Sequence, residues 1–234
     1  MDQLATVLVP GLLGSPRLYA EQLPALWRLG AVTVASHHHA DHVSSLARSI
    51  LAAAPSRFAL VGLSMGGYLA FEIMRQAPHR VARLALLDTT ARADSPERTR
   101  QRHGHVELAR NGRFREVVDT LYDTWVHPAR ATDRELRRLV RQMADETGAE
   151  GFCRQQTAIM TRPDSRPGLS AIRCPTLVVV GAQDTVTTVD HAKEIADAVP
   201  DARLTVVPEC GHLSTVEQPA TVARALVDWL APSH

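Results

Sequence analysis

The amino-acid sequence predicts an α/β protein with a mostly parallel sheet of about six strands and helices on both faces. Three observations lead to this prediction. Short apolar, β-branched runs without alternation recur along the chain, as in strands that are buried on both faces. Helical segments follow most of these runs, which is the rhythm of a parallel sheet. Between Ala91 and Gly168 this rhythm stops, and charged helical segments replace the strands.

The first half of the chain contains four of the predicted strands. They cover Leu4–Pro10, Ala31–Ala35, Phe58–Val61 and Val81–Leu87. Helices are expected between them at about residues 17–29, 41–54 and 65–75, where apolar residues recur at helical spacing. This half is therefore predicted to alternate strand and helix without interruption.

The second half resumes the alternation after a helical block. Strands are predicted at Thr176–Val180 and Arg203–Val207, and helices at about residues 190–199 and 218–230. The block before them should hold helices near residues 96–111, 114–125, 133–147 and 150–160. A proline- and glycine-containing linker at 162–168 leads back to the sheet. We therefore expect residues 1–90 and 169–234 to form one core, with residues 91–168 inserted as a helical cap.

The composition limits the classes of function and location. The chain has 234 residues and a formal net charge of +1, which suits one globular domain and gives no reason to expect nucleic acid or an anionic membrane as partner. Residues 1–20 lack the pattern of a signal peptide, and no apolar run has the length of a membrane span. Cys153, Cys174 and Cys210 are odd in number and outside metal-ligand spacing. We expect free thiols in a cytoplasmic protein.

The clearest functional signal is the turn Gly62-Leu63-Ser64-Met65-Gly66, between a predicted strand and a predicted amphipathic helix. A strand that turns into a helix so sharply forces the central residue into strained backbone angles. A Cβ at position 62 or 66 would collide with the neighbouring strand or helix, which explains the two glycines. An ordinary serine in a tight turn is the alternative, but the strand and helix on either side favour a nucleophile at Ser64.

A serine hydroxyl needs a base, and the base needs a group that orients it. Open parallel sheets place such groups in the loops beyond the carboxyl ends of their strands. These loops contain Asp184 after the fifth predicted strand and His212 after the sixth. Asp88 also follows a strand and is a second candidate for the acid, although Asp184 is favoured.

Four segments that surround these residues resemble the α/β-hydrolase fold superfamily, in its branch of capped esterases and carbon–carbon-bond hydrolases. They read LVPGLLGS (8–15), VGLSMGG (61–67), CPTLVVVGAQDTVT (174–187) and ECGH (209–212). The resemblance implies that Ser64 is the nucleophile, His212 the general base and then acid, and Asp184 the carboxylate that orients His212. It also implies an oxyanion hole made by the backbone N–H groups of Leu12 and Met65.

The chain departs from the family pattern in the loop after the second predicted strand, where it carries a histidine cluster. His37, His38, His39 and His42 stand there in place of a common Arg-Gly-x-Gly turn. Imidazoles can bind zinc, copper or nickel, but adjacent histidines in an extended segment point to opposite sides. No matching cluster of cysteines or carboxylates accompanies them. We therefore expect a solvated loop and no metal.

The cap is expected to contribute part of a substrate pocket. Its large apolar residues at helical spacing either line that pocket or form the cap's own core; they are Phe114, Tyr122, Trp125, Met143, Phe152 and Met160. Of these, Tyr122, Trp125 and Met160 are predicted to line the pocket, together with Leu13 from the loop after the first strand.

The expected reaction is transfer of an acyl group to water, without a cofactor. The leading prediction is a carboxylic ester hydrolase that acts on a small to medium ester, thioester or lactone. Two alternatives stay open. One is hydrolysis of a carbon–carbon bond in a ring-cleavage diketone by the same triad. The other is a weakly catalytic small-molecule receptor on the same scaffold, since fold and motif do not fix function. A monomer or small homo-oligomer is expected.

Overall fold

The computed structural model describes residues 4–231, and within them six strands form one parallel sheet in the order β2-β1-β3-β4-β5-β6. The strands are β1 (Ala5–Val9), β2 (Val32–Val34), β3 (Phe58–Leu63), β4 (Val81–Leu87), β5 (Thr176–Gly181) and β6 (Arg203–Val207). This confirms the predicted fold class. The chain runs outward from β1 to β2 and then returns past β1 to β3. Such a reversal of strand order marks the crevice where open α/β sheets bind ligands.

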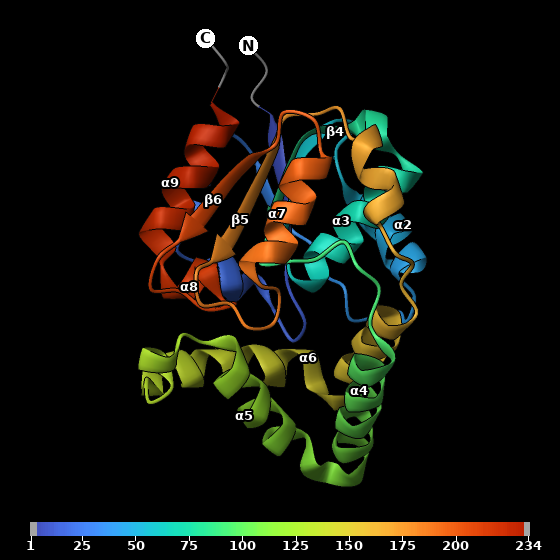
Figure 1. Cartoon of the computed structure of the whole chain (residues 1–234), viewed down its shortest axis with the longest axis vertical. Coiled ribbons are helices and arrows are strands. Elements are labelled where there is room, and N and C mark those ends of the chain that lie inside the picture. The colour runs from blue at the N-terminus through green and yellow to red at the C-terminus, as the bar shows by residue number, and fades with distance from the viewer. Residues whose placement is uncertain (1–3, 232–234) are drawn as a thin grey trace.

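The helices lie on both faces of the sheet and at its carboxyl end (Figure 1). They are α1 (Leu23–Leu26), α2 (Val43–Ala53), α3 (Met65–Gln76), α4 (Pro96–Leu108), α5 (Phe114–Trp125), α6 (Arg134–Met160), α7 (Val189–Ala198), α8 (Ser214–Glu217) and α9 (Pro219–Leu230). Their order along the chain follows the predicted alternation of strand and helix.

Each face of the sheet has its own hydrophobic core. Because successive residues of a strand point to opposite faces, Val7 and Val9 of β1 belong to one buried cluster with residues of α2, α3 and α7, whereas Leu8 belongs to a second cluster with residues of α1 and α9. The strands β1 and β3 to β5 are thus covered on both sides. This explains why their sequences are continuously apolar rather than alternating.

One predicted helix is broken in the structure. We expected a helix over residues 17–29, but the chain forms a 3₁₀ turn at Pro16–Tyr19 and then the short helix α1. Pro24 has no backbone N–H, and its ring would clash with the preceding helical turn, so a helix can only begin beside it. The side chain of Gln22, just before α1, is buried, and its amide donates to the carbonyl of Thr215 at 2.9 Å.

The helices α4, α5 and α6 form a block below the carboxyl end of the sheet (Figure 1). In the chain this α4–α6 block lies between β4 and β5, where the sequence predicted a helical cap. We predicted separate helices at 133–147 and 150–160, and α6 indeed consists of two helical segments joined at a kink, because the backbone of Gly148 is non-helical, with φ of 71° and ψ of 164°. Glycine adopts such angles without the clash that a Cβ would cause.

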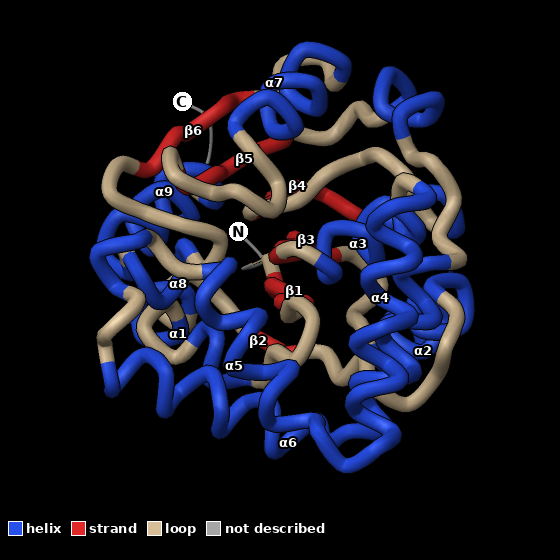
Figure 2. Tube along the Cα trace, turned by 60° about the horizontal axis from the view of Figure 1, so that its bottom comes forward, coloured by secondary structure: helices blue, strands red, loops and turns tan. Residues whose placement is uncertain are grey.

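The block continues the core of the sheet and borders its switch point. Val117 and Val118 of α5 and Val140 of α6 belong to the same buried cluster as Leu8. Seen with this end turned forward, the ends of β1 and β3 lie near the centre of the molecule, with α4 on one side and α5 and α6 below them in the view (Figure 2). No helix within residues 4–231 is long and apolar enough to cross a membrane.

Candidate active site

Ser64 occupies a strained turn between β3 and α3. Its φ and ψ angles are 55° and −112°, outside the regions that L-residues favour. The backbone packs so closely around this turn that the flanking positions have no room for a Cβ. A Cβ on Gly66 would lie 2.0 Å from the carbonyl oxygen of Val9, and one on Gly62 would lie 2.3 Å from that of Gly66. Both positions therefore require glycine, and the turn exposes the Ser64 hydroxyl at the switch point.

The structure brings the three predicted catalytic residues together from the ends of three strands. The Nε2 atom of His212 lies 2.8 Å from Oγ of Ser64, and its Nδ1 atom lies 2.7 Å from Oδ2 of Asp184. A carboxylate can only accept a hydrogen bond, so Nδ1 carries the proton and Nε2 is free to accept the hydroxyl proton. Asp184 is held in turn by the backbone N–H and the hydroxyl of Thr187, at 2.9 and 2.8 Å.

His212 and Asp184 shift each other's pKa in opposite directions. Burial of the imidazole works to lower the pKa of His212, but the nearby Asp184 carboxylate outweighs burial and raises this pKa above its usual value. Burial likewise works to raise the pKa of Asp184, and the charge and hydrogen bond of His212 lower it below its usual value. Asp184 is thus ionised at neutral pH, and its charge can stabilise an imidazolium at His212.

Asp88, the second candidate for the acid, is buried next to these residues and bonds to other partners. Its carboxyl oxygens accept from the N–H of Gly181 at 3.0 Å and from the hydroxyl of Ser214. Burial, and then the charge of Asp184, raise the pKa of Asp88 to about 8. Among the hydrogen bonds of residues 4–231, none joins Asp88 to the His212 ring. The geometry favours Asp184 as the acid.

The loop after β1 lies directly against the turn that carries Ser64, where it can supply the second N–H donor of an oxyanion hole. A Cβ on Gly11 would be 3.3 Å from that of Ser64. The N–H of Leu13 donates to the side-chain oxygen of Gln155 in α6 at 3.0 Å. Within the described part of the chain, the N–H groups of Leu12 and Met65 have no such acceptor. Both donors remain available for a negatively charged oxygen beside Ser64.

His37 is not part of a solvated loop, as we had expected, but supports this β1 loop. It is 1% exposed, and its Nε2 lies 2.9 Å from the carbonyl oxygen of Gly11 and 3.2 Å from the amide nitrogen of Gln155. The carbonyl can only accept, so Nε2 carries the proton, and the amide nitrogen of Gln155, which is also a donor, lies next to Nε2 without accepting its hydrogen bond. Burial lowers the pKa of His37 to about 4, and the ring is neutral at pH 7. His37 and Gln155 thus hold Gly11 and Leu13, the two residues on either side of Leu12.

The remaining histidines of the cluster do not converge. His39 and His42 are exposed and bond to Ser49 and Asp41, respectively. Throughout residues 4–231, no group of three or more histidine, cysteine, aspartate or glutamate side chains is arranged to hold a metal ion. The solvated loop that we predicted is thus found for His39 and His42.

Comparison with known proteins agrees with this architecture. The model of the alpha/beta hydrolase family matches residues 6–225 of the chain. The protein belongs to the α/β-hydrolase family.

Several solved structures and curated proteins are similar to this α/β hydrolase. A thermophilic esterase from Thermogutta terrifontis, solved with malate bound, superimposes with a TM-score of 0.87 at 28% identity, over 97% of this chain and 89% of the esterase. The enol-lactonase from Burkholderia xenovorans LB400 gives 0.88 at 25% identity, over 98% and 92%. A Mycobacterium tuberculosis protein that carries the name non-heme bromoperoxidase is 30% identical over 198 residues, which are 76% of this chain and 69% of that protein.

Two cavities of this α/β hydrolase meet at Ser64 and His212. The smaller, of about 20 Å³, is apolar and lies beside the β1 loop. Its lining includes Leu13, Leu18, Trp125, Val140 and Met143. The larger, of about 220 Å³, extends towards α4. We call them the apolar cavity and the α4 cavity.

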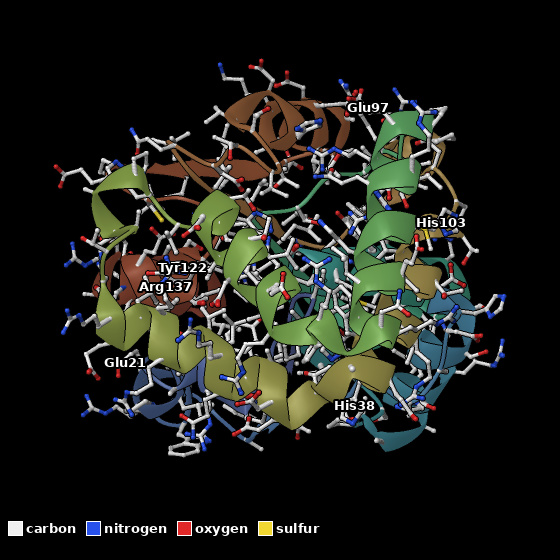
Figure 3. The ribbon with its side chains drawn as sticks, turned by 90° about the horizontal axis from the view of Figure 1, so that it is seen from below. Glu21, His38, Glu97, His103, Tyr122 and Arg137 are labelled. Carbon is white, nitrogen blue, oxygen red and sulfur yellow. The ribbon has the colours of Figure 1, made fainter. Side chains whose placement is uncertain are left out.

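Two residues predicted for the pocket lie elsewhere. The Tyr122 hydroxyl donates to the carbonyl of Arg130 at 2.8 Å, and the guanidinium of Arg137 lies 4.1 Å from the centre of its ring. The two side chains are neighbours in the view from below (Figure 3). Met160 lines neither cavity, whereas Met143 lines the apolar one. Helical periodicity identified the apolar side of each helix, but it could not show which part of that side faces Ser64.

Sequence analysis missed Glu217, a buried carboxylate that joins the His212 loop to the α4–α6 block. It accepts from the backbone N–H groups of His127, Gly211 and Leu213 at 2.6, 3.1 and 3.2 Å. The backbone N–H of His212 also donates to the carbonyl of Trp125 at 2.6 Å. The end of α5 therefore helps to position His212. The only signal was an acidic residue shortly after His212, which in a sequence looks like a solvated charge.

Proposed function

We propose that this α/β hydrolase is a serine hydrolase that cleaves a small to medium carboxylic ester, thioester or lactone through an acyl-enzyme on Ser64. The observation that carries the proposal is the continuous hydrogen-bonded series from Asp184 through His212 to the hydroxyl of Ser64. Beside it lie the unused backbone donors of Leu12 and Met65. A nucleophile, a base, an orienting carboxylate and an oxyanion hole are the parts that acyl transfer needs.

Each group has a defined role in the proposed reaction. Oγ of Ser64 attacks the carbonyl carbon while Nε2 of His212 takes the hydroxyl proton, and the N–H groups of Leu12 and Met65 hold the oxyanion. The carbon–oxygen bond to the alcohol breaks, and His212 gives its proton to the departing oxygen. A water molecule then attacks the acyl-enzyme as His212 takes its proton, which returns to Ser64 when the acid leaves. These steps require no cofactor.

Two of the similar structures support an ester bond as the target. One is called an esterase and the other an enol-lactonase, and a lactone is an internal ester. A panel of purified substrates tests the proposal. It contains a chromogenic short-chain ester, a thioester, a lactone and a vinylogous diketone. We expect turnover of the ester or lactone. Turnover of the diketone alone would favour carbon–carbon-bond cleavage, and saturable binding without turnover would favour a receptor.

We further propose that the α4–α6 block, within residues 91–168, acts as a cap over the site. Trp125 of α5 lines both cavities, and Met143 of α6 lines the apolar one. A cap of this kind excludes water, which strengthens the hydrogen bonds to the oxyanion. The three cysteines are free thiols, and we propose that the protein works in the cytoplasm as a monomer or small homo-oligomer.

The apolar cavity should make the enzyme selective for short chains. Its volume of about 20 Å³ leaves little room for more than a very small group. We expect activity to peak on short to medium acyl esters and to fall on long-chain ones. Met143→Ala should move the optimum to chains longer by roughly two methylene groups, because it removes most of one wall. Acyl and alcohol chain-length series, each read as kcat/KM, measure this shift.

Met160→Ala is the matched control, since it shortens a methionine of the same helix that lines neither cavity. Thermal unfolding of both variants separates a change of the cavity from a loss of stability, which the truncation of the buried Met143 also causes. A profile that Met143→Ala leaves unaltered in both series would show that this cavity does not receive the substrate.

The activity should depend on the protonation of His212. Only the neutral imidazole can take the Ser64 proton, and the pKa of His212 is raised above its ordinary value of 6.5. We therefore expect kcat/KM on a neutral ester to rise with pH through a midpoint above 6.5. Asp184→Asn removes the charge that raises this pKa, so its residual activity should have a lower midpoint. A wild-type midpoint below 6.5 would contradict the assignment.

A further inference from the structure

The α4 cavity has an unusual wall. The residues Arg98, Gln101, Arg102 and His105 of α4 line it, and they recur at the spacing i, i+3, i+4 and i+7 that places side chains on one face of a helix. A helix that covers a core normally turns apolar residues inward. Here the face that lines the cavity is polar and basic. Val106 is the one residue of α4 that is buried. This face therefore looks into the cavity above Ser64 with charged groups.

The cavity carries a positive charge that its own lining does not neutralise. Its other lining residues are Leu12, Ser64, Tyr68, Leu121, Thr124, Trp125, Ile159, Thr185, Val186 and His212. Within the described residues, no aspartate or glutamate stands among those that line it. Two guanidinium groups thus face a space of about 220 Å³ without a carboxylate inside it.

The two arginines differ in how far they are already engaged. The Nε atom of Arg102 pairs with Asp94 at 2.5 Å, and its Nη1 donates to Gln156 at 2.9 Å. Asp94 also pairs with Arg162 at 2.9 Å, so one carboxylate serves two guanidinium groups. Arg102 is therefore held rigidly and only partly neutralised.

Arg98 is the more available partner. Its Nη2 donates to the carbonyl of Val186 at 2.8 Å, in the loop that carries Asp184. Among the ion pairs of residues 4–231, none involves Arg98. The hydrogen bond fixes the position of the guanidinium, and the other N–H groups of its planar fork remain for a ligand. A fork of this kind matches the two oxygens of a carboxylate.

We propose that the substrate carries a free carboxylate in addition to its reacting ester, and that Arg98, supported by Arg102, binds this carboxylate in the α4 cavity. The inference rests on the proposed function and specifies its substrate class: half-esters of dicarboxylic acids, or lactones with a carboxylate side chain. The apolar cavity cannot receive the charge, because burying an unpaired carboxylate is very costly. The two cavities thus orient the substrate, with its charged end at α4 and a small apolar group beside the β1 loop.

The size of the α4 cavity agrees with a short substrate. Its volume of about 220 Å³ is below the roughly 300–1,000 Å³ of pockets for drug-sized ligands. The positive surroundings also affect His105, whose pKa is lowered first by burial and then by Arg102. His105 therefore adds a neutral polar group to the wall rather than a further charge.

The experiment compares ester pairs of equal length that differ only at the far end, one with a carboxylate and one with an amide. Wild-type kcat/KM should be at least about tenfold higher for the carboxylate, and Arg98→Gln should lower this ratio by roughly 10- to 100-fold. Arg98→Lys should restore part of the ratio, since it keeps the charge but loses the fork. Arg100→Gln is the matched control. It removes the same charge from α4 at an exposed position outside the cavity lining, and it should leave the ratio unchanged.

Calorimetric titration with glutarate measures binding of a carboxylate to the same site without turnover. Wild-type protein and Arg100→Gln should bind it, and Arg98→Gln should bind it at least about tenfold more weakly. Equal wild-type kcat/KM for both members of each pair, without glutarate binding, would overturn the proposal. So would an Arg98→Gln variant that loses both members equally, because Arg98 would then only tie α4 to the Val186 loop. Failure of the proposed function is distinct: no ester of either kind would be cleaved.

Discussion

Ser64→Ala should lower kcat by about 10³- to 10⁶-fold and leave the protein folded. The variant removes the only atom that the proposed mechanism uses to form the acyl-enzyme. Alanine can keep the turn, because the closest packing around it involves Gly62 and Gly66 rather than the hydroxyl. What activity remains would come from the oxyanion donors and from substrate binding alone. Steady-state kinetics on a short ester measures the loss, and circular dichroism with thermal unfolding checks the fold.

The control for this prediction is Ser170→Ala, at an exposed serine that lines neither cavity. It should retain wild-type kcat and KM. If Ser64→Ala also kept activity near the wild-type level, the hydrolase mechanism proposed here would be wrong, whatever the substrate.

Asp184→Asn should lower kcat on the order of 10⁴-fold. The asparagine fits the same space, but it cannot stabilise the imidazolium of His212. Its amide group can also turn an N–H towards Nδ1, which favours the wrong tautomer of the ring. Asp88→Asn should cost far less, because no hydrogen bond among those of residues 4–231 joins Asp88 to the His212 ring. The two substitutions remove the same kind of group from neighbouring buried positions, so each controls for the other.

Both variants need the same kinetic assay at a pH well above the midpoint expected for His212, together with thermal unfolding. An Asp88→Asn variant that is the less active of the two, while still folded, would assign the catalytic acid to the end of β4. The hydrogen bond from His212 Nδ1 to Asp184 at 2.7 Å predicts the opposite order.

The sequence was sufficient to predict the sheet and the grouping of Ser64, Asp184 and His212. Strands buried on both faces leave continuous apolar runs, and β4 and β6 have the bounds that these runs indicated. Parallel strands also share one carboxyl edge, so residues that directly follow β3, β5 and β6 must lie near one another. These inferences depend on local pattern and topology, which a single sequence contains.

The sequence could not show the features that depend on contacts between elements far apart in the chain. The His37 ring is buried because Gln155 of α6 and the carbonyl of Gly11 lie beside it, and neither is its neighbour in the chain. The basic wall of the α4 cavity is a second example. Arg98 and Arg102 look like ordinary charges of a solvated helix until the α4–α6 block is placed over Ser64. Met143 and Met160 are equally apolar, and only the bend of α6 at Gly148 and its packing decide between them.

The most direct test of the central claim is the labelling of the protein by a fluorophosphonate, followed by intact mass and peptide mapping. The reagent forms a stable bond only with an activated hydroxyl, and it mimics the tetrahedral intermediate. We predict one adduct per chain, on Ser64, and its loss in the His212→Ala variant. An adduct on another residue, or full esterase activity in a protein that the reagent does not modify, would contradict the mechanism.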